Sequence, residues 1–274
     1  MLKITKVKLI GDLHIGSRFS REDLIKIALK GNDPIILMGD LADAINPKDP
    51  RFDTDCIMTI DEQLTCLLEL LKGKNILGLI DGNHELSLER YSGININKVL
   101  SSQLDIPYLG PNAYITIDDI IFYVYHGTGG GAFKGTILQK LEKVPMHRGA
   151  HIYAQGHSHS LFCVPTMVEV YGKQEVNWLI NTGSFMVDAT YARSKNLPPS
   201  VLGYAVYNTE KNYAYPVLFD ERKEVLKTVY NLDKRGLNDY YVNHTLKETK
   251  EYFDVSERTI CRRLKEYGIS KKTK

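Results

Sequence analysis

Cysteine is scarce in this chain. The 274 residues include only four, at irregular spacings and without a Cys-x-x-Cys pair: Cys56, Cys66, Cys163 and Cys261. A disulfide framework is unusual at this length and cysteine density, and a structural zinc site built on thiolates needs a closely spaced cluster of them. We therefore expect four free thiols and no zinc held by cysteine.

Long apolar runs and a strong net charge are also missing. Stretches such as 34–38 and 76–80 fall far short of the ~18 residues that a membrane-spanning helix needs, and residues 1–8 lack the apolar core of a secretory signal. The net charge of +2 gives the molecule as a whole no general attraction to nucleic acid. With 43% hydrophobic and 25% charged residues, the composition predicts a globular protein, which we expect to be cytoplasmic and not bound to membranes.

What the chain does contain is an alternation of short apolar runs with helical patterns. Five apolar runs predict buried strands: 7–10, 35–38, 76–80, 120–125 and 152–154. Residues 21–29 and 61–71 carry apolar side chains at helical spacing, and Ser20 is the expected N-cap of the first of these helices. Residues 204–219 predict a β-hairpin. Strands that alternate with helices indicate an α/β fold.

Each of the five apolar runs ends in a short polar cluster. In chain order the clusters are Asp12-Leu13-His14, Gly39-Asp40-Leu41-Ala42-Asp43, Gly82-Asn83-His84-Glu85, His126-Gly127 and Gly156-His157-Ser158-His159. They contain five of the eight histidines of the chain. Functional sites in open α/β sheets form at the carboxyl ends of the strands, so we expect these side chains to converge.

The donor types in these clusters indicate a metal site. Imidazole mixed with carboxylate and amide oxygen suits Mn²⁺, Fe or Zn²⁺ better than Mg²⁺ or Ca²⁺. The donors are too many for one tetrahedral ion, and they fit two ions ~3.5–4 Å apart that share a bridging carboxylate. We expect two divalent cations, with manganese favoured and iron, zinc or nickel as alternatives.

The five clusters, in this order, resemble the motifs of the calcineurin-like metallophosphoesterase superfamily: D-x-H, G-D-x-x-D, G-N-H-[DE], a later histidine and G-H-x-H. The resemblance covers roughly residues 7–190. It implies an α/β/β/α sandwich, in which two sheets are flanked by helices, and hydrolysis of phosphoesters at a binuclear metal centre.

The resemblance also implies a role for each residue. Seven residues would hold the cations: Asp12, His14 and His159 the first, Asn83, His126 and His157 the second, and Asp40 both. His84 would protonate the leaving oxygen as the catalytic acid, and Asp43 would orient its ring. The chemistry agrees, because two cations polarise a phosphoryl group and lower the pKa of the water that attacks phosphorus.

Two basic residues are candidates for contact with substrate. Lys134 belongs to a glycine-rich stretch, 127–135, that lacks the Gly-Lys-[Ser/Thr] of a nucleotide-binding P-loop. That stretch is either a flexible loop or a loop that closes on substrate with Lys134 against phosphate. Arg193 is either a second substrate contact or an ordinary surface residue.

Charge is distributed unevenly along the chain. Residues 242–274 contain nine basic and five acidic side chains, whereas residues 1–241 are slightly acidic. This division indicates two modules with different roles. We expect a phosphoesterase domain at 1–221, a helix and linker at 222–241, and a basic helix-turn-helix module at 242–274.

The basic tail predicts two helices. The first helical pattern reaches Phe253, and Ser256 is suited to cap a second helix, which would bury Ile260 and Leu264 and end at Gly268. The pattern V-S-x-x-T-I-x-R-x-L resembles the helix-turn-helix of DNA-binding proteins, whose second helix enters the major groove. Four polar residues on its other faces would contact DNA: Arg258, Thr259, Arg262 and Arg263. The alternative is a small helical hairpin with a solvated basic face or a protein-binding role.

The favoured function is hydrolysis of DNA phosphodiesters. The opening Asp-Leu-His-Ile-Gly-Ser is similar to the nuclease-related branch, and Asp43 is followed by Ala44-Ile45 rather than the Arg-Gly of the phosphoprotein phosphatases. One alternative is a metallophosphatase, or a phosphodiesterase for cyclic nucleotides or other small molecules. Another is a DNA-binding regulator whose esterase-like domain senses a ligand.

Overall fold

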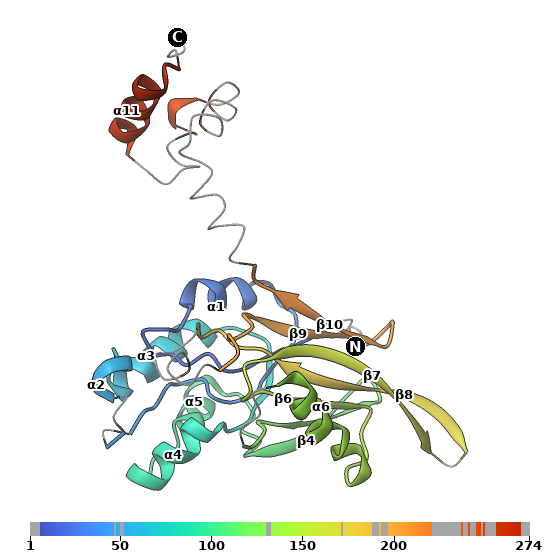
Figure 1. Ribbon diagram of the computed structural model, residues 1–274. Helices are drawn as coiled ribbons and strands as arrows, with labels where there is room; N and C mark the ends of the chain where they lie inside the picture. The colour runs from blue at the N-terminus through green and yellow to red at the C-terminus, as the bar shows by residue number, and fades with distance from the viewer. Residues whose placement is uncertain are drawn as a thin grey trace. The chain divides into compact units, whose positions relative to one another are not determined.

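The apolar runs form the strands of two five-stranded sheets in the computed structural model of the chain (Figure 1). The residues that the structure describes are 6–46, 48–49, 52–129, 133–170, 172–187, 192, 197–220, 237, 241, 245–247, 249 and 256–269. Contacts divide the chain into two compact units, Met1–Phe219 and Asp220–Lys274.

The first sheet has the strand order β10-β9-β1-β2-β3. Its strands are β1 (Lys6–Ile10), β2 (Ile35–Leu37), β3 (Ile76–Leu79), β9 (Gly203–Asn208) and β10 (Tyr213–Leu218). β1, β2 and β3 are parallel, and β9 pairs antiparallel with β1. The carboxyl ends of the three parallel strands therefore share one edge of the sheet, where Asp12, Asp40 and Asn83 follow them.

The second sheet has the order β4-β5-β6-β8-β7. Its strands are β4 (Asn112–Ile117), β5 (Ile120–Tyr125), β6 (Ile152–Gln155), β7 (Leu161–Val170) and β8 (Lys173–Thr182). β5, β6 and β8 are parallel, and His126 and His157 come directly after β5 and β6. β4 and the long β7–β8 hairpin, which is yellow in Figure 1, were not among the strands that the sequence predicted.

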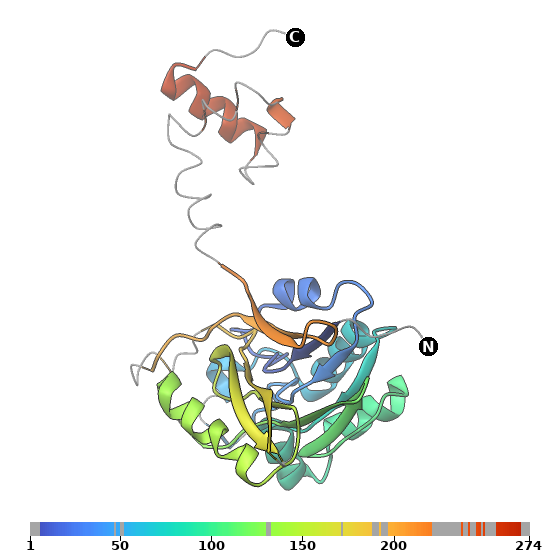
Figure 2. The ribbon, with the colours of Figure 1, turned by 90° about the vertical axis from the view of Figure 1, so that its right-hand side faces the viewer.

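The sheets pack face to face between two layers of helices (Figures 1 and 2). The helices are α1 (Glu22–Ala28), α2 (Phe52–Asp55), α3 (Ile60–Leu71), α4 (Asn83–Ser92), α5 (Ile96–Leu104), α6 (Lys134–Glu142) and the 3₁₀ turn η1 (Val144–Met146). Leu9 of β1 packs between the sheets with Phe122 of β5, whereas its neighbour Ile10 faces the core formed with α1, α3, α4 and α5, because successive strand side chains point to opposite faces. On the outer face of the second sheet, Tyr153 packs against Leu141 of α6. The predicted α/β/β/α architecture is confirmed.

Helices α1 and α3 have different N-terminal capping arrangements. Ser20 is not the N-cap of α1: Arg21 occupies that position without a side-chain cap bond, and the Ser20 hydroxyl instead donates to the Leu13 carbonyl at 2.7 Å. The predicted cap was therefore wrong, because the serine is used to hold the loop after β1. Thr59 caps α3 through a reciprocal capping box with Glu62. No helix in the described part of the chain combines the length and apolarity that a bilayer span requires.

The second unit contains α11 (Glu257–Tyr267). The Ser256 side chain accepts the backbone N–H of Thr259, and Gly268 ends the helix in the left-handed conformation (φ 68°). Ile260 and Leu264 are buried, as the sequence predicted. Three sequence predictions lie outside the described residues: the position of Arg193, almost all of the 222–241 segment, and the end of the first tail helix at Phe253.

Candidate metal centre

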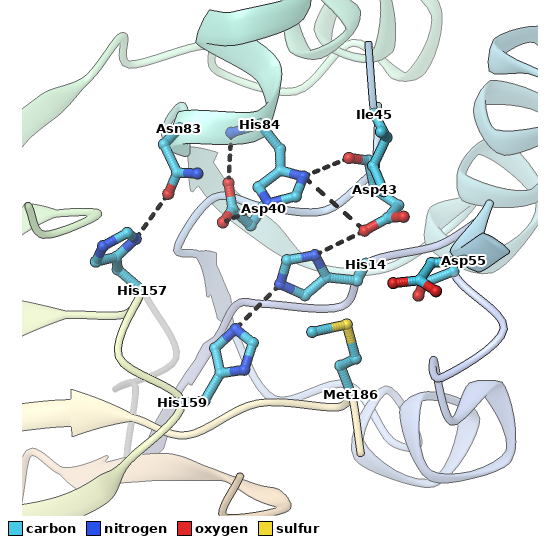
Figure 3. Close-up of a pocket in the computed structure, with 11 residues that line it drawn as sticks. His14, Asp40, Asp43, Ile45, Asp55, Asn83, His84, His157, His159 and Met186 are labelled. Atoms are coloured by element: carbon cyan, nitrogen blue, oxygen red, sulfur yellow. Dashed lines mark hydrogen bonds and ion pairs between the residues drawn. The ribbon is translucent and has the colours of Figure 1, made fainter. Parts of the chain in front are cut away.

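The structure brings the predicted metal ligands together where the parallel strands of both sheets end (Figure 3). In the first group, Asp12, His14 and His159 place their ligand atoms within 4.8 Å of one another. The Nε2 atom of His159 lies 3.1 Å from Nε2 of His14 and 3.4 Å from Oδ1 of Asp12. These are the three residues that the sequence assigned to one cation.

The second group contains Asp40, His126 and His157, again with ligand atoms within 4.8 Å of one another. His126 Nε2 lies 3.0 Å from Asp40 Oδ2 and 3.2 Å from Asn83 Oδ1. Asn83 Oδ1 is also 2.7 Å from Nδ1 of His157. The four residues assigned to the other cation are thus adjacent, while the bridging role of Asp40 remains a prediction.

The carboxylates of both groups are buried. Asp12 and Asp40 are only 0% and 2% exposed, and within the described ranges neither forms an ion pair with lysine or arginine. Buried carboxylates without a cationic partner are strongly destabilising. The two groups therefore require positive charge from histidine protons or from bound cations.

The hydrogen bonds of His126 show that a cation fits the second group. Its Nδ1 donates to the Met38 carbonyl at 2.8 Å, so Nε2 of the neutral ring carries a lone pair directed at Asp40 and Asn83, whose oxygens are acceptors. Burial opposes the imidazolium form, but the adjacent Asp40 raises the pKa of His126 to about 10. Without a metal, a proton on Nε2 of His126 lies between this nitrogen and the oxygens of Asp40 and Asn83. A divalent cation would replace that proton and bind the nitrogen and the oxygens at once.

Five of the predicted ligand residues have left-handed backbone conformations. The residues with positive φ are Asp12 (53°), His14 (49°), Asp40 (49°), His157 (67°) and His159 (52°). Non-glycine residues are uncommon in this region, and where they occur they concentrate at functional sites. In this conformation, side chains that follow different strands are directed toward a common point.

Glu85 holds two of these strand ends together. Its buried carboxylate accepts the backbone N–H groups of Asp40, Leu41 and Ala42 after β2, and of Gly82 after β3, at 2.7–3.2 Å. The sequence did not give Glu85 a role, although it is the acidic position of the G-N-H-[DE] motif. Two of its donors belong to the predicted ligand Asp40 and to the residue before the ligand Asn83, so Glu85 positions the second metal group.

Gly82 lets the β3 loop approach the β2 loop. A Cβ atom added there would lie 2.1 Å from Oδ1 of Asp40 and 2.3 Å from its backbone nitrogen. Any side chain at this position would overlap the carboxylate. The glycine of the motif is therefore required by the close approach of the two loops.

His84 and Asp43 lie beside both groups (Figure 3) and form a third set with His14, whose ligand atoms also lie within 4.8 Å of one another. The Nδ1 of His84 donates to the backbone carbonyl of Asp43, and the Asp43 carboxylate is nearer to His14, at 3.2 Å, than to His84, at 3.9 Å. Asp43 thus contacts the His84 ring chiefly through its main chain. Burial opposes protonation of His84, yet Asp40 and Asp43 raise the pKa of its imidazole above the ordinary value.

A cavity of about 160 Å³ opens at the centre and is lined mainly by these polar side chains. Asp55 also lines it, with a buried Oδ1 atom that has no hydrogen-bond partner among the described residues. Asp55 was not predicted, and no motif marks it in the sequence. Lys134 is exposed at the start of α6 and is not among the residues that line this cavity.

Comparison with known proteins points to one family. The family model for calcineurin-like phosphoesterases matches residues 5–153. Similar solved structures include an archaeal phosphodiesterase (15% identity, 78% of this chain and 99% of that chain, TM-score 0.43) and the phosphoesterase Yfce from E. coli (14%, 78% and 100%, TM-score 0.40). A third is a metallophosphoesterase from Sphaerobacter thermophilus (12%, 94% and 98%, TM-score 0.40). The search of curated proteins found no match.

Proposed function

Because the chain belongs to the calcineurin-like phosphoesterase family and is therefore a hydrolase of phosphoester bonds, we propose that it cleaves phosphodiesters at a centre of two divalent cations, manganese being the first to test. The observation that carries this proposal is the convergence of two separate groups of acceptor atoms around one cavity. Asp12, His14 and His159 would hold one cation. Asp40, Asn83, His126 and His157 would hold the other.

The charge of the cavity favours diesters over monoesters. Among the described residues that line it, there is no lysine or arginine. A phosphomonoester brings two negative charges at neutral pH, whereas a diester brings one. Asp40 would be engaged by the cations, but Asp43 and Asp55 also line the cavity and would repel the second charge of a monoester, so the singly charged diester is the easier anion to accommodate.

The catalytic proton would be held at Nε2 of His84. Since Nδ1 donates to the Asp43 carbonyl, the orientation of the ring is set, and Nε2 lies on the opposite side, 4.0 Å from Oδ2 of Asp40. Two bound cations would supply Lewis acidity to the phosphoryl group and to the attacking water. The imidazolium form, favoured by the neighbouring carboxylates, would protonate the leaving oxygen.

We propose further that α11 directs the enzyme to DNA. Arg258 and Arg262 have exposed side chains on this helix, which is the arrangement that groove binding needs. Arg263 is less suited, because its guanidinium bonds Glu266 at 2.9 Å and lies over the ring of Tyr267. Arg262 is also near Glu266, at 3.8 Å, so Arg258 is the principal candidate. Thr259 bonds the capping Ser256.

The test is a hydrolysis assay with Mn²⁺ that compares bis-p-nitrophenyl phosphate with p-nitrophenyl phosphate, alongside labelled single- and double-stranded DNA. Asp40→Asn should abolish all activity. Arg258→Glu with Arg262→Glu should reduce cleavage of DNA alone, and Lys173→Glu with Lys211→Glu, at exposed positions of the body, is the control with the same change in charge. Cleavage of the monoester only would replace the diesterase proposal by a phosphatase. Tight DNA binding without any turnover would indicate a regulator.

A further inference from the structure

A second and larger cavity opens on the other side of His157. Its volume is about 440 Å³. It lies between the loop after β5, helix α6 with the following turn η1, and the loop after β6. Four residues of its lining belong to the sequence motifs, Gly127, Gly156, His157 and Ser158, and Thr128 and Gly129 belong to the glycine-rich stretch 127–135.

His157 forms a wall common to both cavities. Its side chain lines the 160 Å³ cavity of the metal centre and the 440 Å³ cavity, while its Nδ1 faces Asn83 in the second metal group. A phosphorus atom near Asn83 and His157 therefore has this ring beside it. A substituent of the phosphate that extended past this ring would reach the larger cavity.

The lining combines apolar surface with a few polar groups. Tyr125, Ile137 and Val144 supply the apolar part, and Thr128 and Ser158 supply hydroxyl groups. Small-molecule sites typically have this composition and volumes of ~300–1,000 Å³. Phosphate alone needs neither the volume nor the apolar surface, so the occupant is an organic group with a hydrogen-bonding periphery.

The polar floor of the cavity is held by hydrogen bonds between neutral side chains. The Tyr125 hydroxyl donates to Oε1 of Gln155 at 2.5 Å, and Nε2 of Gln155 donates to Oδ1 of Asn181 at 3.1 Å. Burial raises the pKa of the Tyr125 phenol, which keeps it neutral. These neutral hydrogen-bonding groups beside the Tyr125 ring suit a planar heterocycle, and the one lysine of the described lining, Lys140, is exposed on α6.

We propose that the 440 Å³ cavity is a subsite for the nucleoside of a nucleotide diester whose phosphorus lies at the metal centre. This inference rests on the proposed diesterase function, and it extends that function by naming the substrate class and the place where the base and sugar bind. Lys140 is exposed on α6 and lines the cavity. A larger side chain at this position would reduce the volume of the cavity.

The first experiment measures binding of adenosine, guanosine, cytidine and uridine to the full chain by isothermal titration calorimetry, with ribose as the ligand that lacks a base. We expect at least one nucleoside to bind and ribose not to bind. Lys140→Trp should weaken nucleoside binding at least tenfold. Gln139→Trp is the matched control, because Gln139 is the exposed neighbour on the same helix and does not line the cavity.

The second experiment connects the cavity to the metal centre. The bound nucleoside should inhibit hydrolysis of bis-p-nitrophenyl phosphate, and the inhibition should disappear in Lys140→Trp but persist in Gln139→Trp. Diester hydrolysis with no nucleoside binding, or nucleoside binding without inhibition, would overturn the subsite and leave the proposed function intact. Nucleoside binding without any diester hydrolysis would overturn the proposed function and, with it, the role of the cavity in catalysis.

Discussion

Nε2 of His14 lies 3.1 Å from Nε2 of His159, although the two residues are 145 positions apart in the chain. The other ring nitrogens are already engaged, since Nδ1 of His14 faces Oδ1 of Asp43 and Nδ1 of His159 faces the Ser200 hydroxyl, both at 3.2 Å. The two Nε2 atoms and the Asp12 carboxylate therefore meet at one point. A cation at that point would connect the first sheet to the second.

Binding of Mn²⁺ should therefore stabilise the fold. At a concentration one hundred times the Kd, one site adds about 2.7 kcal/mol to the free energy of unfolding, which is about 5–10 °C in Tm for a body of this size. Thermal unfolding followed by fluorescence of Trp178, the single tryptophan, would measure the shift. In His159→Ala and in Asp40→Asn, Mn²⁺ should raise the Tm by less than it does in the unmodified protein. If Mn²⁺ raises the Tm of both variants as much as that of the unmodified protein, the assigned ligands are wrong.

His84→Ala should retain the metals and lose turnover. A general acid contributes ~10²–10⁴-fold to a rate, so kcat for bis-p-nitrophenyl phosphate should fall within that range while the metal content by mass spectrometry stays unchanged. Loss of a metal ion would instead show that His84 is a ligand, in the group that it forms with His14 and Asp43.

Glu85→Ala should destabilise the body by about 4 kcal/mol or more, because four buried backbone N–H groups lose their acceptor at ~1–3 kcal/mol each. Urea unfolding monitored at Trp178 would give this value. Glu85→Asp keeps the charge and should recover part of the stability, and Glu85→Gln should recover less, because its amide hydrogens oppose the donors. If Glu85→Ala unfolds at the urea concentration of the unmodified protein, the anchoring role is wrong.

Gly156→Ala should damage the first metal group through contact alone. The added methyl would lie 2.5 Å from Oδ2 of Asp12, and overpacking of this kind costs about 1–3 kcal/mol. We expect affinity for Mn²⁺ to fall about tenfold or more, as measured by calorimetry. Gly149→Ala, where a methyl meets nothing within 4 Å, should leave affinity unchanged. Equal affinities in the two variants would refute this account.

The convergence of the candidate ligands could be predicted from sequence because their spacing relative to the strands is local information. Asp12 and Asp40 follow apolar runs that are strands in the structure, and parallel strands bring their carboxyl ends to one edge. The β9–β10 hairpin was also predicted correctly, and Tyr213 pairs with Asn208 at its turn.

Other features depend on contacts between distant segments and left no local pattern. The Ser20 hydroxyl donates to the Leu13 carbonyl instead of capping α1, because the loop after β1 brings that carbonyl within reach. Three of the backbone N–H groups that donate to Glu85 lie 43–45 residues before it in the chain, so its role emerges only after folding. The left-handed conformation of His157 and the cavity beside it likewise follow from packing between the loops.

The anchoring of two loops by Glu85 has a consequence for how such a site can change over time. Glu85 lies in the first turn of α4 together with Asn83 and His84, so one short segment carries a predicted metal ligand, the proposed acid and the group that fastens the β2 loop. Insertions before β3 or after α4 leave this segment intact. With Gly82, which precedes the helix, these four consecutive positions can therefore stay unchanged while loops elsewhere vary in length.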